Sequence, residues 1–79
     1  MTELSDADSA ILAFEHRRWN HAGAKEEAIT VELKMTPTRY YQALNALIDR
    51  PEALVADPML VKRLRRLRET RRAQRSGLD

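Results

Sequence analysis

Hydrophobic residues recur every three or four positions in four stretches of this chain, which is the spacing of one face of an α-helix. The predicted helices cover about residues 6–20, 24–34, 37–48 and 58–67. The residues predicted to face the core are Leu4, Ala7, Ile11, Phe14 and Trp19 in the first, Ala28, Ile29 and Leu33 in the second, Tyr40, Leu44, Leu47 and Ile48 in the third, and Leu60, Val61, Leu64 and Leu67 in the fourth. The pattern therefore predicts an all-α fold, a small helical bundle.

Residues with special backbone preferences mark the boundaries of these helices. Gly23 is predicted to end the first helix by adopting a positive φ. Thr36 is predicted to cap the third helix, with Pro37 at its first position, where the missing amide of proline does no harm. Pro51 disfavours continuation of the third helix, so residues 49–55 are expected to form at most one short helical turn.

About three residues separate the second and third predicted helices, which is the spacing of a helix-turn-helix. The third helix carries an outward set of polar or hydrogen-bonding residues: Thr38, Arg39, Tyr41, Gln42 and Asn45. Arg39 suits guanine, and Gln42 or Asn45 suits adenine. Thr38 and Tyr41 suit phosphates or a thymine methyl group. The alternative is a plain packing hairpin, because any helix of a soluble protein shows polar residues on its outer side.

Charge is distributed unevenly along the 79 residues, although the formal net charge is only +2. Residues 1–35 hold seven acids and four bases, a net charge of −3, while residues 36–79 hold five acids and ten bases, a net charge of +5. Residues 62–75 contain a single acid, Glu69, and eight bases: Lys62, Arg63, Arg65, Arg66, Arg68, Arg71, Arg72 and Arg75. Seven of the eight are arginine, which forms multiple hydrogen bonds with phosphate, so this run predicts an anionic partner such as nucleic acid.

The apolar stripe of the fourth predicted helix stops at Leu67. Residues 1–67 are therefore predicted to form the helical domain and residues 68–79 a basic C-terminal extension. Because residues 68–75 have no apolar anchor in the pattern, we expect them to be exposed, frayed or ordered only by a partner. Binding to a membrane surface is disfavoured, because it requires an apolar face that continues along the basic helix.

Several function classes lack support in the sequence. There is no cysteine, and His16 and His21 do not have the spacing of a two-histidine zinc site on a helix. Neither glycine belongs to a phosphate-binding loop, and no catalytic arrangement of side chains is suggested. No signal peptide is expected, because the first ten residues are acidic. We expect a cytoplasmic protein that is not an enzyme and that uses no metal or cofactor.

The segments AGAKEEAI, TRYYQALNALIDRPEAL and DPMLVKRLRRLR together resemble a family of small actinobacterial proteins catalogued as a domain of unknown function. The resemblance covers about residues 5–72. One mycobacterial relative is described as a nucleoid-associated DNA-binding protein, which implies chromosome binding and transcriptional regulation for this chain. The helix-turn-helix is also similar to the DNA-contacting part of sigma factors. The resemblance implies no catalytic residue.

These observations together predict a DNA-binding protein of the bacterial nucleoid, with double-stranded DNA as its partner. The third helix would contact bases in the major groove, and the eight bases of residues 62–75 would contact phosphates. The alternative is a protein-interaction module that docks on an acidic surface of RNA polymerase or another transcription protein. RNA binding is a weaker alternative, because no stacking motif of the common RNA modules is present. For recognition of a palindromic site, a homodimer would be expected.

Overall fold

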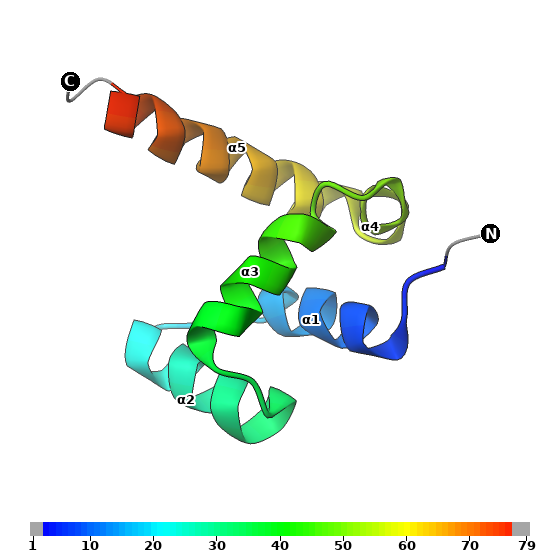
Figure 1. Ribbon diagram of the computed structural model, residues 1–79, viewed down its shortest axis with the longest axis vertical. Helices are drawn as coiled ribbons and strands as arrows, with labels where there is room; N and C mark the ends of the chain where they lie inside the picture. The colour runs from blue at the N-terminus through cyan, green and yellow to red at the C-terminus, as the bar shows by residue number, and fades with distance from the viewer. Residues whose placement is uncertain (1–2, 77–79) are drawn as a thin grey trace.

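The computed structural model describes residues 3–76, which form five α-helices and no β-strand (Figure 1). The helices are α1 (Asp6–His16), α2 (Ala22–Leu33), α3 (Pro37–Leu47), α4 (Pro51–Ala56) and α5 (Pro58–Ser76). The predicted all-α class, with a helix-turn-helix and a basic C-terminal helix, is therefore confirmed.

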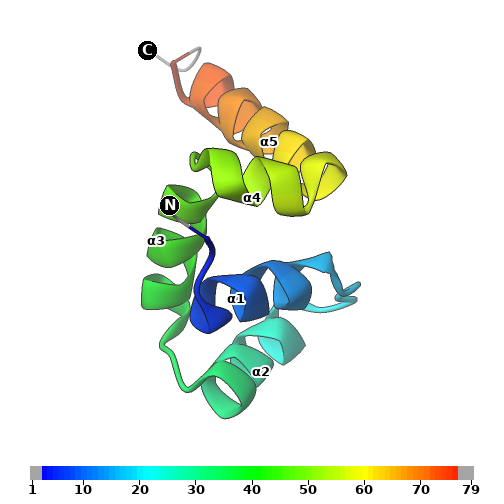
Figure 2. The same cartoon turned by 90° about the vertical axis from the view of Figure 1, so that its right-hand side faces the viewer.

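The central helix α3 joins the two parts of the fold. It packs against both α1 and α2, and α4 packs against α5 at the far end of the molecule (Figures 1 and 2). Helix α5 then extends well beyond α3 (Figure 1). The Cα radius of gyration is 13.4 Å, somewhat larger than the value of about 12 Å expected for a compact chain of this length. Residues of α5 and α3 line a groove on one side of α3.

All five helices contribute buried residues to the core, and the contribution of α2 is Ile29. Tyr40, Ile29 and Val61 are its largest fully buried side chains. The four predicted inward residues of α3 are all buried, as the spacing predicted. The prediction is wrong for Ala7 and Leu67, which are exposed. Leu67 is 45 % exposed because α5 at that point extends beyond the core.

The predicted start of α3 is confirmed in detail. Thr36 has an extended backbone, and its Oγ1 accepts a hydrogen bond from the backbone N–H of Arg39 at 3.2 Å. Pro37 occupies the first helical turn, where no intrahelical acceptor is available for a backbone N–H. The cap therefore sets the direction in which α3 leaves the turn after α2.

Helix α1 ends at His16, four residues before the predicted end near Asn20. The backbone of Arg17 is extended, with ψ of 150°, and its N–H donates to the Phe14 carbonyl at 3.2 Å. The Trp19 indole also donates to this carbonyl, at 3.3 Å, and its ring lies 4.7 Å from the Phe14 ring between centroids. Packing of the indole back onto α1 thus replaces the last predicted turn of the helix.

The prediction that Gly23 ends the first helix with a positive φ is wrong, because Gly23 lies inside α2. The extended backbone of His21 starts α2 without any left-handed residue. Within residues 3–76, the non-glycine residue with positive φ is Lys34, at 58°, where α2 ends. The Met35 N–H donates back to the Ile29 carbonyl at 3.5 Å and closes the turn between α2 and α3.

Helix α5 continues to Ser76, so the predicted helix end at residue 67 is also wrong. The sequence from Leu67 onward contains arginine, glutamate, alanine and glutamine, which favour helix, and no proline or glycine before residue 77. The expected short turn after α3 is the six-residue helix α4, which buries Ala53. Residues 1–2 and 77–79 and the side chains of Arg75 and Ser76 lie outside the described part.

Candidate nucleic-acid interface

The outer face of α3 is open to solvent. The five predicted base- and edge-contacting residues, Thr38, Arg39, Tyr41, Gln42 and Asn45, are all exposed. They lie opposite or beside the buried stripe that begins at Tyr40. Thr38, Arg39 and Gln42 do not line the groove with α5, while Tyr41, 41 % exposed, lies at the edge that faces α5.

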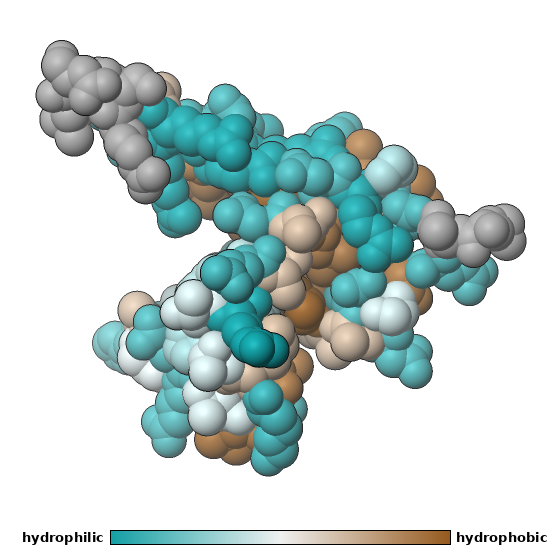
Figure 3. All heavy atoms as spheres, in the orientation of Figure 1, coloured by the Kyte–Doolittle hydropathy of each residue, from teal (hydrophilic) through white to brown (hydrophobic). Residues whose placement is uncertain are grey.

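A groove brings part of this face together with α5. Its walls include Tyr41 and Asn45 from α3, and Leu67, Arg71 and Arg72 from α5. Figure 3 shows the surface hollowed between α5 and the part of the molecule that contains α2. The same view shows a hydrophilic surface over nearly the whole length of α5. We call this hollow the α3–α5 groove; it places arginine guanidinium groups beside side chains suited to contact base edges.

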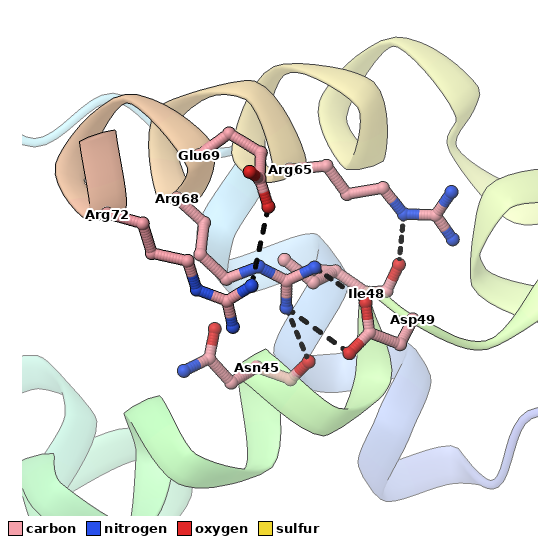
Figure 4. Close-up of polar contacts among 7 residues, drawn as sticks. All are labelled: Asn45, Ile48, Asp49, Arg65, Arg68, Glu69 and Arg72. Atoms are coloured by element: carbon pink, nitrogen blue, oxygen red, sulfur yellow. Dashed lines mark hydrogen bonds and ion pairs between the residues drawn. The ribbon is translucent and has the colours of Figure 1, made fainter. Parts of the chain in front are cut away.

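Arg68 does not extend freely into solvent, although it belongs to the predicted unanchored extension. Its guanidinium donates to both carboxylate oxygens of Asp49, at 2.6 and 3.2 Å, and to the Asn45 carbonyl at 3.4 Å (Figure 4). The side chain is only 19 % exposed. The expectation of exposure is therefore wrong for Arg68, which has a polar anchor in place of an apolar one, and it is confirmed for residues 69–74, which are exposed.

Arg65 has a similar role one turn earlier. Its Nε donates to the Ile48 carbonyl at 2.6 Å, just beyond the end of α3 (Figure 4). The last carbonyls of a helix have no intrahelical donor, and the negative end of the helix dipole lies there. Arg65 and Arg68, both predicted as phosphate ligands, thus stabilise the C-terminal end of α3.

The Asp49–Arg68 pair predicts a pH-dependent stability. The hydrogen bond from Arg68 is the main cause that lowers the pKa of Asp49 from 3.8. A carboxyl with a lowered pKa in the folded state stabilises the fold above its ordinary pKa, and this contribution is lost as the pH falls through the folded value. Arg68→Gln should therefore lower the free energy of unfolding at pH 7 by about 1 kcal/mol, limited by solvent screening around the exposed carboxylate.

Urea denaturation followed by circular dichroism at pH 7 and near pH 3 tests this prediction. The difference between wild type and Arg68→Gln should shrink as the pH falls below about 4, where Asp49 becomes protonated in the unfolded chain. Arg71→Gln is the matched control, because it removes the same charge from an exposed side chain of the same helix. Equal, pH-independent losses in both variants would contradict the assigned role of Arg68.

The other predicted phosphate ligands lie on two sides of α5. Arg71 is exposed and lines the α3–α5 groove, and Arg72 beside it forms an exposed pair with Glu69 at 3.3 Å. Lys62, Arg63 and Arg66 are exposed and line a second groove. Its other wall is the segment that connects α1 with α2. The backbone of Arg75 belongs to α5, but its side chain lies outside the described part.

A half-buried polar cluster holds α3 against α1 and α2. The Tyr40 hydroxyl donates to Glu15 Oε1 at 2.5 Å, and Lys25 Nζ lies 2.9 Å from the same oxygen. Burial, and next the hydrogen bond to Glu15, raise the pKa of the Tyr40 hydroxyl, so this group stays a donor. Lys25 Nζ also lies 5.3 Å from the ring centroid of Tyr41. Because these contacts join three helices, they determine where the outer face of α3 lies.

A family model matches residues 3–76 and carries the description "Protein of unknown function (DUF3263)". The chain belongs to the DUF3263 family. The match includes both the helix-turn-helix and all of α5, so the basic helix is part of the DUF3263 domain. No curated protein and no solved structure matches the chain significantly.

Sequence reasoning missed four charged residues that contribute to these surfaces of the DUF3263 chain. Arg17 and Arg18 line the second groove, Lys25 lies in both grooves, and Asp49 binds Arg68. The adjacent arginines at 17 and 18 were a visible signal in a mostly acidic half of the chain. Lys25 and Asp49 gave no such signal, because their roles depend on partners in other helices.

Two further properties of the DUF3263 structure bear on its chemistry. In residues 3–76, no group of three or more histidine, cysteine, aspartate or glutamate side chains is arranged to hold a metal ion. His16 instead pairs with Asp57 at 3.1 Å. Across the same residues, no helix has both the length and the apolar character needed to cross a membrane.

Proposed function

We propose that this chain binds double-stranded DNA, with α3 in the major groove and α5 against the phosphate backbone. The α3–α5 groove is the observation that carries this proposal, because Tyr41 and Asn45 of α3 line it together with Arg71 and Arg72 of α5. A helix that can contact base edges thus lies beside guanidinium groups that can neutralise phosphates. Base contacts specify a sequence, while phosphate contacts supply affinity and set the register.

The outer face of α3 supplies the chemistry for base recognition. Arg39 can donate two hydrogen bonds to guanine, and the amide groups of Gln42 and Asn45 can pair with adenine. Thr38 and Tyr41 flank these residues at positions suited to phosphates or a thymine methyl group. Arg39 forms no ion pair within residues 3–76, so its guanidinium is available to a ligand.

The bases of α5 divide into internal and available groups. Arg65 and Arg68 hold the end of α3, so we assign the phosphate contacts on this side to Arg71 and Arg72. Such contacts supply affinity for DNA of any sequence, and this affinity falls as the salt concentration rises. A nucleoid-associated or regulatory role suits this combination, and the sequence resemblance to proteins with a nucleoid-associated mycobacterial member supports it. The corresponding location is the nucleoid.

Mobility-shift titrations with two duplexes of unrelated sequence, at several salt concentrations, test the proposal. Arg71→Ala should weaken binding to both duplexes and reduce the slope of log K against log salt by about 1. Asn45→Ala and Arg39→Ala should instead reduce the difference between preferred and unrelated duplexes, by about 1–3 kcal/mol where a two-bond contact is lost. Each kind of variant is thus the control for the other.

The wild-type chain provides the outcome that would overturn the proposal. If it retards neither duplex at low salt, DNA binding is excluded under the conditions that favour it most. The basic surface of α5 would then point to the alternative partner, an acidic surface of RNA polymerase or another transcription protein. If the wild type binds DNA but Asn45→Ala and Arg39→Ala keep its sequence preference, α3 does not contact bases.

A further inference from the structure

We infer that Arg18, Lys62, Arg63 and Arg66 form a second binding site for the backbone of double-stranded DNA, so that one chain holds two duplexes together. This inference rests on the proposed function, which needs only the α3–α5 groove. The second site lies on a different side of α5 and uses residues from two distant parts of the sequence.

The site is a groove between the chain that follows α1 and the first half of α5. Arg17, Arg18 and Trp19 line one wall, and Lys62, Arg63 and Arg66 line the other. Figure 2 shows the connection between α1 and α2 and the start of α5 on the same side of the molecule. Folding thus combines two basic clusters that are more than forty residues apart in the sequence.

The positive charge of this groove is largely uncompensated. Arg18, Lys62, Arg63 and Arg66 are exposed and form no ion pair within residues 3–76. Arg17 is partly offset by Glu32 at 2.7 Å. Glu15, the carboxylate that lines the groove, is already bound by Lys25 and the Tyr40 hydroxyl. Four cations are therefore available to an external anion.

The geometry of α5 separates these cations from the α3–α5 groove, which is the first DNA-binding site. Lys62 and Arg71 are nine residues apart, which is about two and a half helical turns, so they project from opposite sides of the helix. A phosphate backbone in the α3–α5 groove lies along the side that carries Arg71. The second cluster is then directed away from that duplex and remains free to bind another.

The chemistry of the second groove favours a duplex backbone over single-stranded nucleic acid. Single strands bind through aromatic rings on which bases stack. The Trp19 ring is covered by the Phe14 ring at 4.7 Å and by the Arg17 guanidinium at 4.5 Å, and its Nε1 donates to the Phe14 carbonyl. The groove offers guanidinium and ammonium groups without a free stacking surface, which is what recognition of a phosphate backbone needs.

A two-duplex capture experiment tests this inference with the full chain. One biotinylated duplex is fixed on beads, and the amount of a second, fluorescent duplex held by added protein is measured. The double variant Lys62→Glu/Arg66→Glu should lose at least about tenfold of the captured fluorescence, because it reverses the charge of the second site. It should still retard a single duplex in mobility shifts, because the α3–α5 groove keeps Arg71 and Arg72.

The control variant Arg71→Glu/Arg72→Glu carries the same change of charge on the first site, so it should weaken the single-duplex shift as well as capture. Unchanged capture by Lys62→Glu/Arg66→Glu would overturn the inference while leaving the proposed function intact. So would a wild-type chain that shifts single duplexes but captures no second one. Absence of any shift would instead overturn the proposed function.

A mixture of the two double variants separates one chain from a pair of chains. If each chain holds two duplexes by its own two sites, the mixture should capture no more than the sum of its components. If the mixture restores wild-type capture, each duplex is held by a different copy in an oligomer, and the inference is wrong. Sedimentation of both variants alone, in the absence of DNA, verifies that they share the oligomeric state of the wild type.

Discussion

Tyr40→Ala is expected to lower the free energy of unfolding by about 3–5 kcal/mol, as for other buried aromatic residues replaced by alanine. The Tyr40 side chain is fully buried, and its ring lies 5.4 Å from that of Phe14 between centroids. Its hydroxyl is held by Glu15. Because a domain of this size has a total stability near the lower end of about 5–15 kcal/mol, much of the variant should be unfolded.

The neighbouring tyrosine is the matched control. Tyr41 is 41 % exposed and packs edge-on against Tyr40, with ring centroids 5.1 Å apart. Tyr41→Ala should therefore cost only about 1 kcal/mol, from the loss of this aromatic contact. Urea denaturation followed by far-ultraviolet circular dichroism measures both. Similar losses of stability in the two variants would contradict the assignment of Tyr40 to the core and of Tyr41 to the surface.

Glu15→Ala is expected to cost about 3 kcal/mol, because it removes one partner of an ion pair that is largely shielded from solvent. The side chains of Glu15 and Lys25 are only 11 % and 16 % exposed. The substitution leaves the Lys25 ammonium without its counter-ion and the Tyr40 hydroxyl without its acceptor. Both groups are then partly desolvated and unsatisfied, which costs more than the net value of the contact itself.

Two further variants make this second prediction specific. Glu32→Ala also removes a carboxylate from an ion pair, but Arg17 and Glu32 are 50 % and 45 % exposed, so the cost should be below about 1 kcal/mol. Glu15→Ala/Lys25→Met should lose less than Glu15→Ala alone, because the unpaired ammonium is gone as well. The midpoint of thermal unfolding measures all three. A loss for Glu15→Ala no larger than that for Glu32→Ala would refute the assignment.

The parts of the fold that depend on local sequence were predictable. The period of Tyr40, Leu44, Leu47 and Ile48 correctly predicted the buried side of α3. The Thr36 cap correctly predicted its start, because a cap joins residues that are three apart. These contacts are within one helix or its first turn, so their spacing is visible in the sequence.

The parts that depend on distant partners were not predictable. Helix α1 ends early because the Trp19 indole packs back onto Phe14, and no helix propensity shows that contact. Arg68 reaches Asp49, 19 positions away in the chain. In the sequence, Arg68 is indistinguishable from Arg71, which is exposed and forms no ion pair within residues 3–76.

The same distinction applies to the candidate site. The outward side of α3 could be derived by removing its buried residues, and the five side chains assigned to it are exposed. That Tyr41 and Asn45 share a groove with Arg71 could not be derived, because it depends on the angle at which α5 leaves α4. The second groove depends on the path of the chain after α1, which was predicted as helix.

The contacts of Arg65 and Arg68 with the end of α3 constrain how this protein can evolve. A mutation of either arginine that changes the charge of α5 also removes a hydrogen bond that holds the end of α3. Such a mutation would lower the stability of the fold and therefore the amount of folded protein in the cell. Changes in the charge of α5 are thus confined to its outer positions, while Arg65 and Arg68 tolerate few substitutions.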